Sequence, residues 1–231
     1  MNKYLKLIRI KQWIKNGVVF IPLVFSLSFK DSALILNSFL AFLAFSFCAS
    51  GVYIRNDLAD VLKDRNHPKK KFRPIPSGEI KMHTAHFLSV AMFLLSFIAL
   101  YMLNIKCLLI MCLYILINYF YTKHLKQIPI LDIGCIASGF ILRVLIGCFA
   151  ISVTPSAYLI LATFFASTFF GFYKRMLEIS LKTDNTREVL SKYNKNILEN
   201  YILVSGSLFI AFYTFYTLTR QLNDDMHSEY L

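Results

Sequence analysis

Long apolar runs are the feature of this sequence that most limits how the chain can fold. A helix that spans a bilayer needs about 20 mostly apolar residues, because each residue adds about 1.5 Å across a hydrocarbon core of about 30 Å. Charged residues make up 16% of the chain, whereas about a quarter is typical of a soluble domain. We therefore predict an all-α integral membrane protein. Its seven apolar runs lie near residues 17–29, 33–54, 84–103, 105–122, 130–152, 156–173 and 200–219.

The basic residues predict how these runs are oriented in the membrane. Of the 25 Lys and Arg residues, 21 lie in the N-terminal segment or after the second, fourth and sixth runs. Cytoplasmic loops are rich in Lys and Arg, so we expect the N-terminus and these loops to lie on the cytoplasmic side of a bacterial inner membrane. The same alternation indicates that the first run spans, although it contains Pro22 and taken alone could be re-entrant. This topology and anionic lipid account for the net charge of +12 without a nucleic-acid partner.

The segment after the second run, residues 55–83, carries the candidate chemistry. Asn56, Asp60 and Asp64 are spaced i, i+4 and i+8, so they share one face if the second helix continues past the membrane edge. Asp57 adds a third carboxylate beside them. Hard carboxylate and amide oxygens suit Mg²⁺, which proteins bind through one or two carboxylates plus substrate phosphates. These four residues are the predicted metal ligands, and the alternative is a solvated helix end with an ordinary charged face.

A basic tract follows directly in residues 65–73. It includes Arg65, Lys70 and Arg73, and the prolines around it together with Gly78 exclude a long helix. A stiff loop of basic side chains beside a magnesium site predicts a clamp for a diphosphate group. Anchoring to anionic lipid headgroups is the alternative, because it explains the charge although not the prolines.

Ionisable residues inside the apolar runs are further candidates. Asp132 and Arg143 lie eleven residues apart in the fifth run, which is about three helical turns, so they face the same way. A charge near the bilayer centre costs at least about 2.5–3.5 kcal/mol and marks a candidate site, although Asp132 could simply lie at the interface. His83 and His86 begin the third run without a nearby acidic partner, and we interpret them as interfacial.

The motifs formed by these residues resemble those of the UbiA superfamily of membrane prenyltransferases. NDLADVLKD, residues 56–64, matches N-D-x-x-D-x-x-x-D, and DRNHPKKKFRPIPSG, residues 64–78, is similar to the signature of the decaprenyl-phosphate 5-phosphoribosyltransferase branch. Pro76 stands where that branch usually has Ala. Three more motifs fit: R-x-x-Q-W-x-K-N-x-x-V-F-x-P-L from Arg9, Y-x-x-x-L-K…D…G-F-x-L-R…G from Tyr121, and K-R-x-x-E from Lys174.

The resemblance implies a fold and a set of site residues. The fold is a UbiA-like transmembrane bundle with a cytoplasm-facing cavity, in one domain over residues 1–231. Family members typically have nine transmembrane helices, so we expect the last two to be absent from this chain. The implied metal is Mg²⁺, held by Asn56, Asp57, Asp60 and Asp64. The implied catalytic residues are Asp60, Asp64, Lys70 and Arg73, and the implied substrate-binding residues are Lys15, Asn16, Arg65, Lys126, Asp132, Arg143, Lys174 and Arg175.

The resemblance also implies a reaction. In it, 5-phosphoribosyl diphosphate gives its phosphoribosyl group to a polyprenyl phosphate, releasing diphosphate, in the synthesis of a cell-envelope glycan precursor. The lipid phosphate attacks the anomeric carbon, so a protein nucleophile is not required. Two alternatives stay open. One is a prenyltransferase that acts on an aromatic acceptor in a quinone or haem pathway. The other is a truncated, inactive lipid-binding bundle. A second chain could complete the cavity wall, as in a homo-oligomer.

Overall fold

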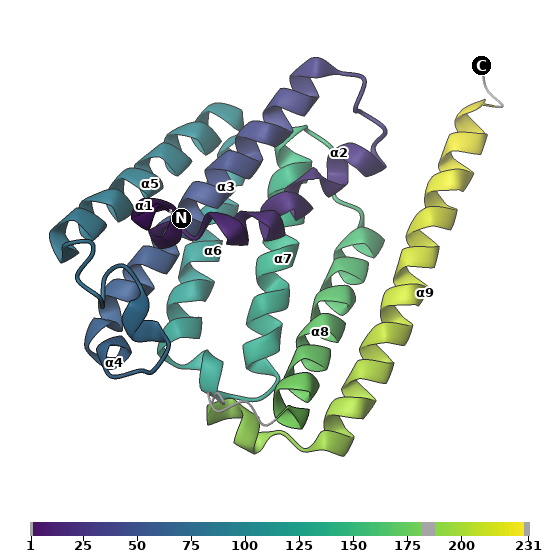
Figure 1. Cartoon of the computed structure of the whole chain (residues 1–231). Coiled ribbons are helices and arrows are strands. Elements are labelled where there is room, and N and C mark those ends of the chain that lie inside the picture. Colours follow the sequence, from purple (N-terminus) through teal and green to yellow (C-terminus); the bar gives the residue numbers. More distant parts are fainter. Residues whose placement is uncertain (1, 182–187, 229–231) are drawn as a thin grey trace. The chain divides into compact units, whose positions relative to one another are not determined.

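The structure, a computed structural model, describes residues 2–181 and 188–228 (Figure 1). Within these ranges it is helical and contains no β-strand. The elements in chain order are α1 (Lys3–Leu7), the 3₁₀ helix η1 (Ile10–Phe20), α2 (Ile21–Phe25), α3 (Ser32–Ala59), α4 (Val61–Arg65), η2 (Lys70–Phe72), α5 (Met82–Leu103), α6 (Ile105–Lys123), η3 (Leu125–Gln127), α7 (Leu131–Ala150), α8 (Ala157–Ser180), η4 (Glu188–Lys192) and α9 (Lys195–Ser228).

Six helices within the described ranges are long and apolar enough to cross a membrane. They are α3, α5, α6, α7, α8 and α9, and they coincide with the second to seventh apolar runs of the sequence. This confirms the prediction of an all-α integral membrane protein. Part of the basic segment after the sixth run, residues 182–187, lies outside the described residues.

The first apolar run differs from the expected spanning α-helix. It forms the 3₁₀ helix η1 and the five-residue helix α2. Pro22 lies in the first turn of α2, the part of a helix that tolerates a residue without a backbone N–H, so it begins a new helix. Among the described residues, six single helices are therefore long and apolar enough to span, and the spanning of the first run stays a prediction.

Hydrogen bonds to α3 fix the path of this first run. Trp13 Nε1 donates to Ser50 Oγ and Asn16 Nδ2 donates to Ser46 Oγ, each at 3.0 Å. Further along, the ring of Phe20 lies 5.3 Å from that of Phe42. The partner numbers on α3 fall as the numbers along η1 rise, so the segment runs antiparallel to α3. These contacts hold the first run against α3 along its 3₁₀ segment.

The chain folds as two compact units. Unit 1 comprises Met1–Leu116 and Arg143–Val153, and unit 2 comprises Ile117–Leu142 and Thr154–Leu231. Helices α6 and α7 each contribute residues to both units. The single domain expected over residues 1–231 stays a prediction.

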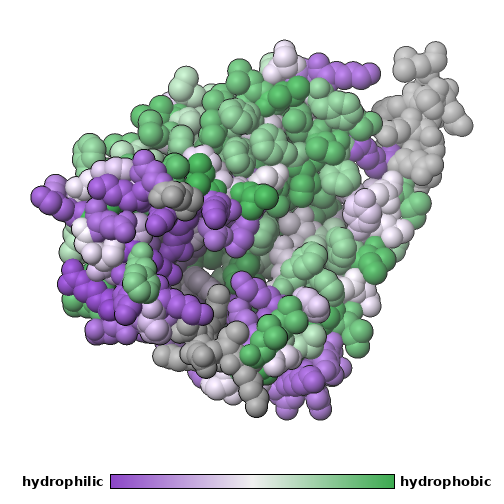
Figure 2. Space-filling model, in the orientation of Figure 1, coloured by the Kyte–Doolittle hydropathy of each residue, from purple (hydrophilic) through white to green (hydrophobic). Residues whose placement is uncertain are grey.

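Unit 1 is built around α3, which packs against α5 and η1. Small residues bring the backbones close, and a Cβ atom added at Gly51 would lie 3.0 Å from the ring of Phe93 on α5. At the end of α3 near α4, a buried apolar cluster joins α1, α3, α4, the following loop and α5. Its members are Leu7, Ile54, Val61, Ile75, Ile80 and Ala85. In Figure 2, hydrophilic residues gather at this end of unit 1, and hydrophobic residues cover the long helices.

Unit 2 is held together by aromatic and apolar packing between α7, α8 and α9. Ile133, Phe172 and Leu198 form its buried cluster. The rings of Phe165 and Phe212 stack at 5.5 Å between α8 and α9. A long α9 with many exposed apolar side chains is typical of a helix that faces lipid.

Gly147 on α7 provides a test of this packing in unit 1. A Cβ atom there would lie 2.2 Å from the carbonyl oxygen of Val19, so Gly147→Ala must displace the backbone of the first run. We expect the free energy of unfolding to fall by about 1–3 kcal/mol, measured as a lower Tm in detergent micelles. Gly134→Ala on the same helix is the control, because a Cβ there meets open space. An unchanged Tm for Gly147→Ala would contradict this packing.

Candidate functional site

The acidic segment lies where α3 ends and α4 begins. Asp60 is both the C-cap residue of α3 and the N-cap residue of α4, and its backbone angles lie outside the α-helical region. Hydrogen bonding nevertheless continues across the break, because Asp60 N donates to Asn56 O at 3.0 Å and Asp64 N donates to Asp60 O at 2.8 Å. Asn56, Asp60 and Asp64 therefore stand on successive turns. The helix bends at Asp60 and does not run straight past it.

Two buried carboxylates share one cation at this bend. Arg73 Nη1 lies 3.0 Å from Asp57 Oδ1 and 2.8 Å from Asp64 Oδ2. Arg9 Nη2 is 2.6 Å from the same Asp57 oxygen, and Lys70 Nζ is 3.7 Å from Asp64 Oδ1. Asp57 and Asp64 are only 4% and 1% exposed, so these cations offset charges that water cannot reach. We call these five residues the acid–base cluster.

The loop after α4 is folded so that Arg73 faces the carboxylates. Ile75 and Ile80 are buried in the apolar cluster beneath it, which anchors the loop. The ring Nδ1 of His67 accepts hydrogen bonds from the backbone N–H groups of Lys69 and Lys70, each at 3.2 Å. This turn starts η2 and places Lys70 toward Asp64. The apolar anchor and the turn at His67 thus hold the basic side chains of this loop near the carboxylates.

Arg9 joins the cluster from the N-terminal segment. It lies between α1 and η1 in the left-handed backbone conformation, with φ of 53°. That conformation is costly for a residue with a side chain. The guanidinium lies over the ring of Tyr53 at 4.7 Å and reaches Asp57. Arg9 is not among the site residues predicted from the sequence, although its place at the start of the R-x-x-Q-W motif was an available signal.

Other predicted residues of this region stand apart from the cluster. Asp60 is half-buried and Arg65 is exposed, and neither forms an ion pair with a residue that the structure describes. Lys15 is exposed on η1. Their roles in substrate or metal binding stay predictions.

Arg143 and Asn16 form a buried polar contact inside unit 1. Arg143 Nε donates to Asn16 Oδ1 at 2.9 Å, and both residues are buried. The guanidinium carbon lies 4.5 Å from the ring centre of Phe45 and 5.5 Å from that of Tyr114. Aromatic faces stabilise a cation that has left water. The two predicted substrate-binding residues are thus brought together, although they are 127 positions apart.

Asp132 and Arg175 form a buried ion pair in unit 2. Arg175 Nε lies 3.0 Å from Asp132 Oδ2, and Arg175 Nη1 lies 3.3 Å from Glu178 Oε2. Tyr193 completes the group, since its hydroxyl donates to Asp132 Oδ1 at 2.6 Å and accepts from Ile130 N at 2.7 Å. Burial raises the pKa of Tyr193, and its bond to the Asp132 carboxylate raises it further, so the phenol stays a donor.

Asp132 and Arg143, the two charged residues within α7, have different partners. Asp132 pairs with Arg175, and Arg143 pairs with Asn16, so the shared helix face of Asp132 and Arg143 does not indicate a contact between them. Tyr193 was not predicted, because nothing in its sequence neighbourhood distinguishes it from the other tyrosines. Of the remaining predicted residues, Lys126 is half-buried on η3 and Lys174 is exposed on α8.

Comparison with known proteins decides the family. A model of the UbiA prenyltransferase family matches residues 18–187. The chain belongs to this family. It is 36% identical over 183 residues to the decaprenyl-phosphate phosphoribosyltransferase of Corynebacterium glutamicum. The aligned residues cover 77% of this chain and 54% of that relative. The chain thus spans about half the length of that relative. The enzyme of the same name from Mycolicibacterium smegmatis is 29% identical over 231 residues, covering 96% of this chain and 72% of the relative.

Solved structures of UbiA proteins share the fold. A UbiA homologue from Archaeoglobus fulgidus, bound to GPP and Mg²⁺, has a TM-score of 0.75 at 21% identity, covering 94% of this chain and 78% of that chain. A UbiA homologue from Aeropyrum pernix without ligand has a TM-score of 0.65 at 15% identity, covering 92% of this chain and 78% of that chain. These likenesses confirm the predicted UbiA-like helical bundle.

For a UbiA protein, the acid–base cluster is the candidate cation site. No group of three or more His, Cys, Asp and Glu side chains in the described part of the chain is placed to hold a metal ion. Mg²⁺ does not need such a cage, because proteins commonly bind it through one or two carboxylates plus substrate phosphates. Asp57 and Asp64 already direct two carboxylates at one cationic nitrogen of Arg73. This donor set fits Mg²⁺, and the four predicted metal ligands stay a prediction.

The hydroxyl of Tyr193 provides a test of the buried group in unit 2. Tyr193→Phe removes a hydrogen bond to a buried carboxylate, so we expect the free energy of unfolding to fall by about 1–3 kcal/mol. The measurement is the Tm of the purified protein in detergent. Tyr158→Phe is the matched control, because the hydroxyl of Tyr158 makes no hydrogen bond to a described residue. Equal Tm values for the two variants would show that the Asp132 contact adds no stability.

Proposed function

We propose that this UbiA protein transfers the 5-phosphoribosyl group of 5-phosphoribosyl diphosphate to a polyprenyl phosphate and releases diphosphate. The observation that carries the proposal is the acid–base cluster, in which the branch's characteristic basic tract is folded back onto its acidic motif. Arg73 and Lys70 contact Asp64 directly. Relatives named decaprenyl-phosphate phosphoribosyltransferase match most of this chain, which supports the same substrates. The product serves as a cell-envelope glycan precursor.

The acid–base cluster contains carboxylates that suit a metal ion and basic side chains that suit diphosphate oxygens. Asp57 and Asp64, with Asn56 and Asp60 on the neighbouring turns, would hold Mg²⁺, which when bound neutralises charge on the departing diphosphate. Arg73 and Lys70 each have further N–H donors that can bond diphosphate oxygens.

Bond changes in the reaction need no protein nucleophile. An oxygen of the lipid phosphate bonds to the anomeric carbon of ribose, and the bond from that carbon to the diphosphate oxygen breaks. The electron pair leaves with the diphosphate, whose negative charge is what the basic side chains stabilise. Preorganised cations therefore supply most of what the protein must contribute.

The basic end of the molecule supports an orientation. The N-terminal segment and the loop after α4 meet at the acid–base cluster through Arg9 and Asp57. Both segments are rich in Lys and Arg, which is typical of cytoplasmic segments. We therefore place this site on the cytoplasmic side of a bacterial inner membrane, where a water-soluble sugar diphosphate is available.

A transfer assay tests the proposed reaction. Membranes that contain this chain are given 5-phosphoribosyl diphosphate labelled in the ribose and a polyprenyl phosphate. We expect label in the lipid fraction with Mg²⁺ and none when EDTA removes it. Absence of labelled lipid from protein shown to be folded would contradict the proposed function.

Replacing one carboxylate by an amide tests the role of the acid–base cluster in the transfer reaction. Asp64→Asn removes the charge shared by Arg73 and Lys70, so we expect kcat to fall at least about a hundredfold. Asp31→Asn is the matched control at the other end of α3, where the side chain only caps the helix and Asn caps equally well. Equal activity of both variants would remove Asp64 from the mechanism.

Prenyl transfer is the second candidate function. The digeranylgeranylglyceryl phosphate synthase of Sulfurisphaera tokodaii is 36% identical over 129 residues, covering 55% of this chain and 45% of that relative. The name of this relative indicates a product that carries geranylgeranyl groups, which favours a prenyl donor. The two functions share a diphosphate site and differ in the group that is transferred. Label carried into a product from a prenyl diphosphate, and none from 5-phosphoribosyl diphosphate, would establish the second function in place of the first.

A further inference from the structure

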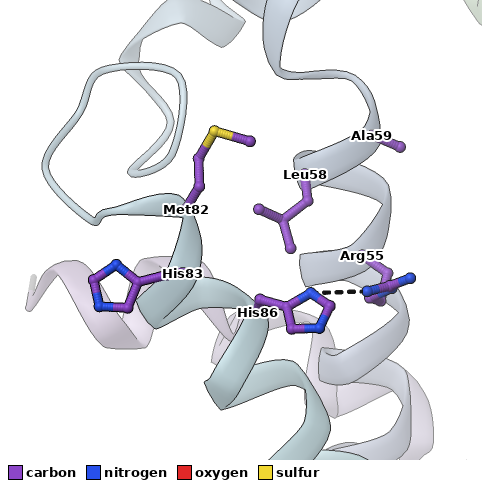
Figure 3. Close-up of a pocket in the computed structure, with 6 residues that line it drawn as sticks. All are labelled: Arg55, Leu58, Ala59, Met82, His83 and His86. Atoms are coloured by element: carbon purple, nitrogen blue, oxygen red, sulfur yellow. Dashed lines mark hydrogen bonds between the residues drawn. The ribbon is translucent and has the colours of Figure 1, made fainter.

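A surface pocket of about 440 Å³ lies where α3 ends and α5 begins (Figure 3). Its lining combines three nitrogen-bearing side chains with three apolar ones. The lining residues are Arg55, Leu58, Ala59, Met82, His83 and His86. Both helices are apolar enough to span a membrane, so their joined ends place this pocket at the membrane edge.

The pocket lies on the opposite face of α3 from the acid–base cluster. Successive helical residues are rotated by about 100°, so Arg55 and Ala59 lie on nearly the same side of the helix. Asp57, between them, points about 200° away from Arg55 by the same rule. The pocket therefore does not belong to the proposed transfer site.

Arg55 and His86 contact each other in the pocket and keep further N–H donors beyond that contact. Arg55 Nη1 lies 3.0 Å from His86 Nδ1. A guanidinium has no acceptor, so His86 accepts at Nδ1 and a neutral ring carries its proton at Nε2. Figure 3 shows both side chains at the same edge of the pocket. Arg9, Arg73 and Arg175 are each paired with a carboxylate, whereas Arg55 forms no ion pair within the described ranges and no carboxylate lines its pocket.

An apolar stripe continues from this pocket along the outer face of α5. Its residues follow His83 at intervals of three or four, which places them on one helix face. They are Phe87, Val90, Leu94 and Ile98, with exposures of 75%, 42%, 55% and 58%. Side chains this large and this exposed on a membrane-spanning helix contact lipid. N–H groups that can bind an anion thus lie directly at the end of a lipid-facing stripe.

We propose that the pocket binds the phosphate of an anionic membrane phospholipid, whose acyl chain lies along the stripe of α5. Arg55 and His86 Nε2 donate charge-assisted hydrogen bonds to the phosphate oxygens. Leu58 and Met82 cover the glycerol end of the lipid. The site fits a lipid better than a free anion, because the N–H donors lie directly beside the apolar stripe. A lipid has both a phosphate for the donors and an acyl chain for the stripe. A bound lipid would fix the end of α3 that carries the acidic motif.

Native mass spectrometry of the purified chain in detergent tests this site without depending on transfer activity. The probe is dioleoyl phosphatidylglycerol, and the readout is the Kd of the first bound lipid. We expect Arg55→Gln to raise this Kd about tenfold, the effect of losing a charged hydrogen bond. Phe87→Ala should also raise it, because the stripe loses its largest side chain. Lys63 is exposed on α4 and forms no ion pair with the residues described, so Lys63→Gln removes the same charge and should leave the Kd unchanged.

Three results would overturn the proposal. The first is equal Kd values for the wild type and Arg55→Gln. The second is an equal loss in Lys63→Gln, which would mean that only general charge attracts the lipid. The third takes one of two forms. In one form, millimolar inorganic phosphate displaces the bound lipid. In the other, Arg55→Gln weakens the binding of polyprenyl phosphate but not that of phosphatidylglycerol. Either form of the third result would assign the pocket to another phosphate compound.

Discussion

Two carboxylates buried at the end of a membrane helix need a counterion, and Arg73 is placed between them. Asp57 and Asp64 are nearly inaccessible to water, so their charges depend on fixed cations for stabilisation. That requirement explains the folding of the loop after α4. The loop turns at His67, reaches back with Arg73 and is anchored by Ile75 and its neighbours in the apolar cluster. The basic tract and the acidic motif therefore form one structural unit.

The same arrangement is what a diphosphate-transfer site requires. Carboxylates that face a common cation can exchange part of that contact for a divalent ion, and the released N–H groups of Arg73 and Lys70 are then available to diphosphate. The buried group of Asp132, Arg175 and Tyr193 works differently, since it joins α7, α8 and the segment before α9. The proposed chemistry rests on the first group, and the predicted substrate-binding roles of Asp132 and Arg175 in the second group stay predictions.

Local sequence was sufficient where the physical cause is local. Six apolar runs predicted six long helices, because length and apolarity alone decide whether a segment can cross a membrane. The acidic and basic tracts were found because Asp57, Asp64 and Arg73 are close in the chain. Contacts between distant segments could not be predicted from the sequence. Arg9 and Asp57 are 48 positions apart, and Arg143 and Asn16 are 127 positions apart. The 3₁₀ path of the first run also depends on such distant contacts.

Electron paramagnetic resonance of Mn²⁺ tests the central claim most directly. Mn²⁺ prefers the same oxygen ligands as Mg²⁺, and its signal separates bound from free ion. With diphosphate present, the account predicts about one bound Mn²⁺ per chain in the wild type, since the proposal assigns one cation site to the acid–base cluster. It predicts almost none when Asp57 and Asp64 are both replaced by Asn. Equal binding by the wild type and this double variant would contradict the claim that these two carboxylates form the cation site.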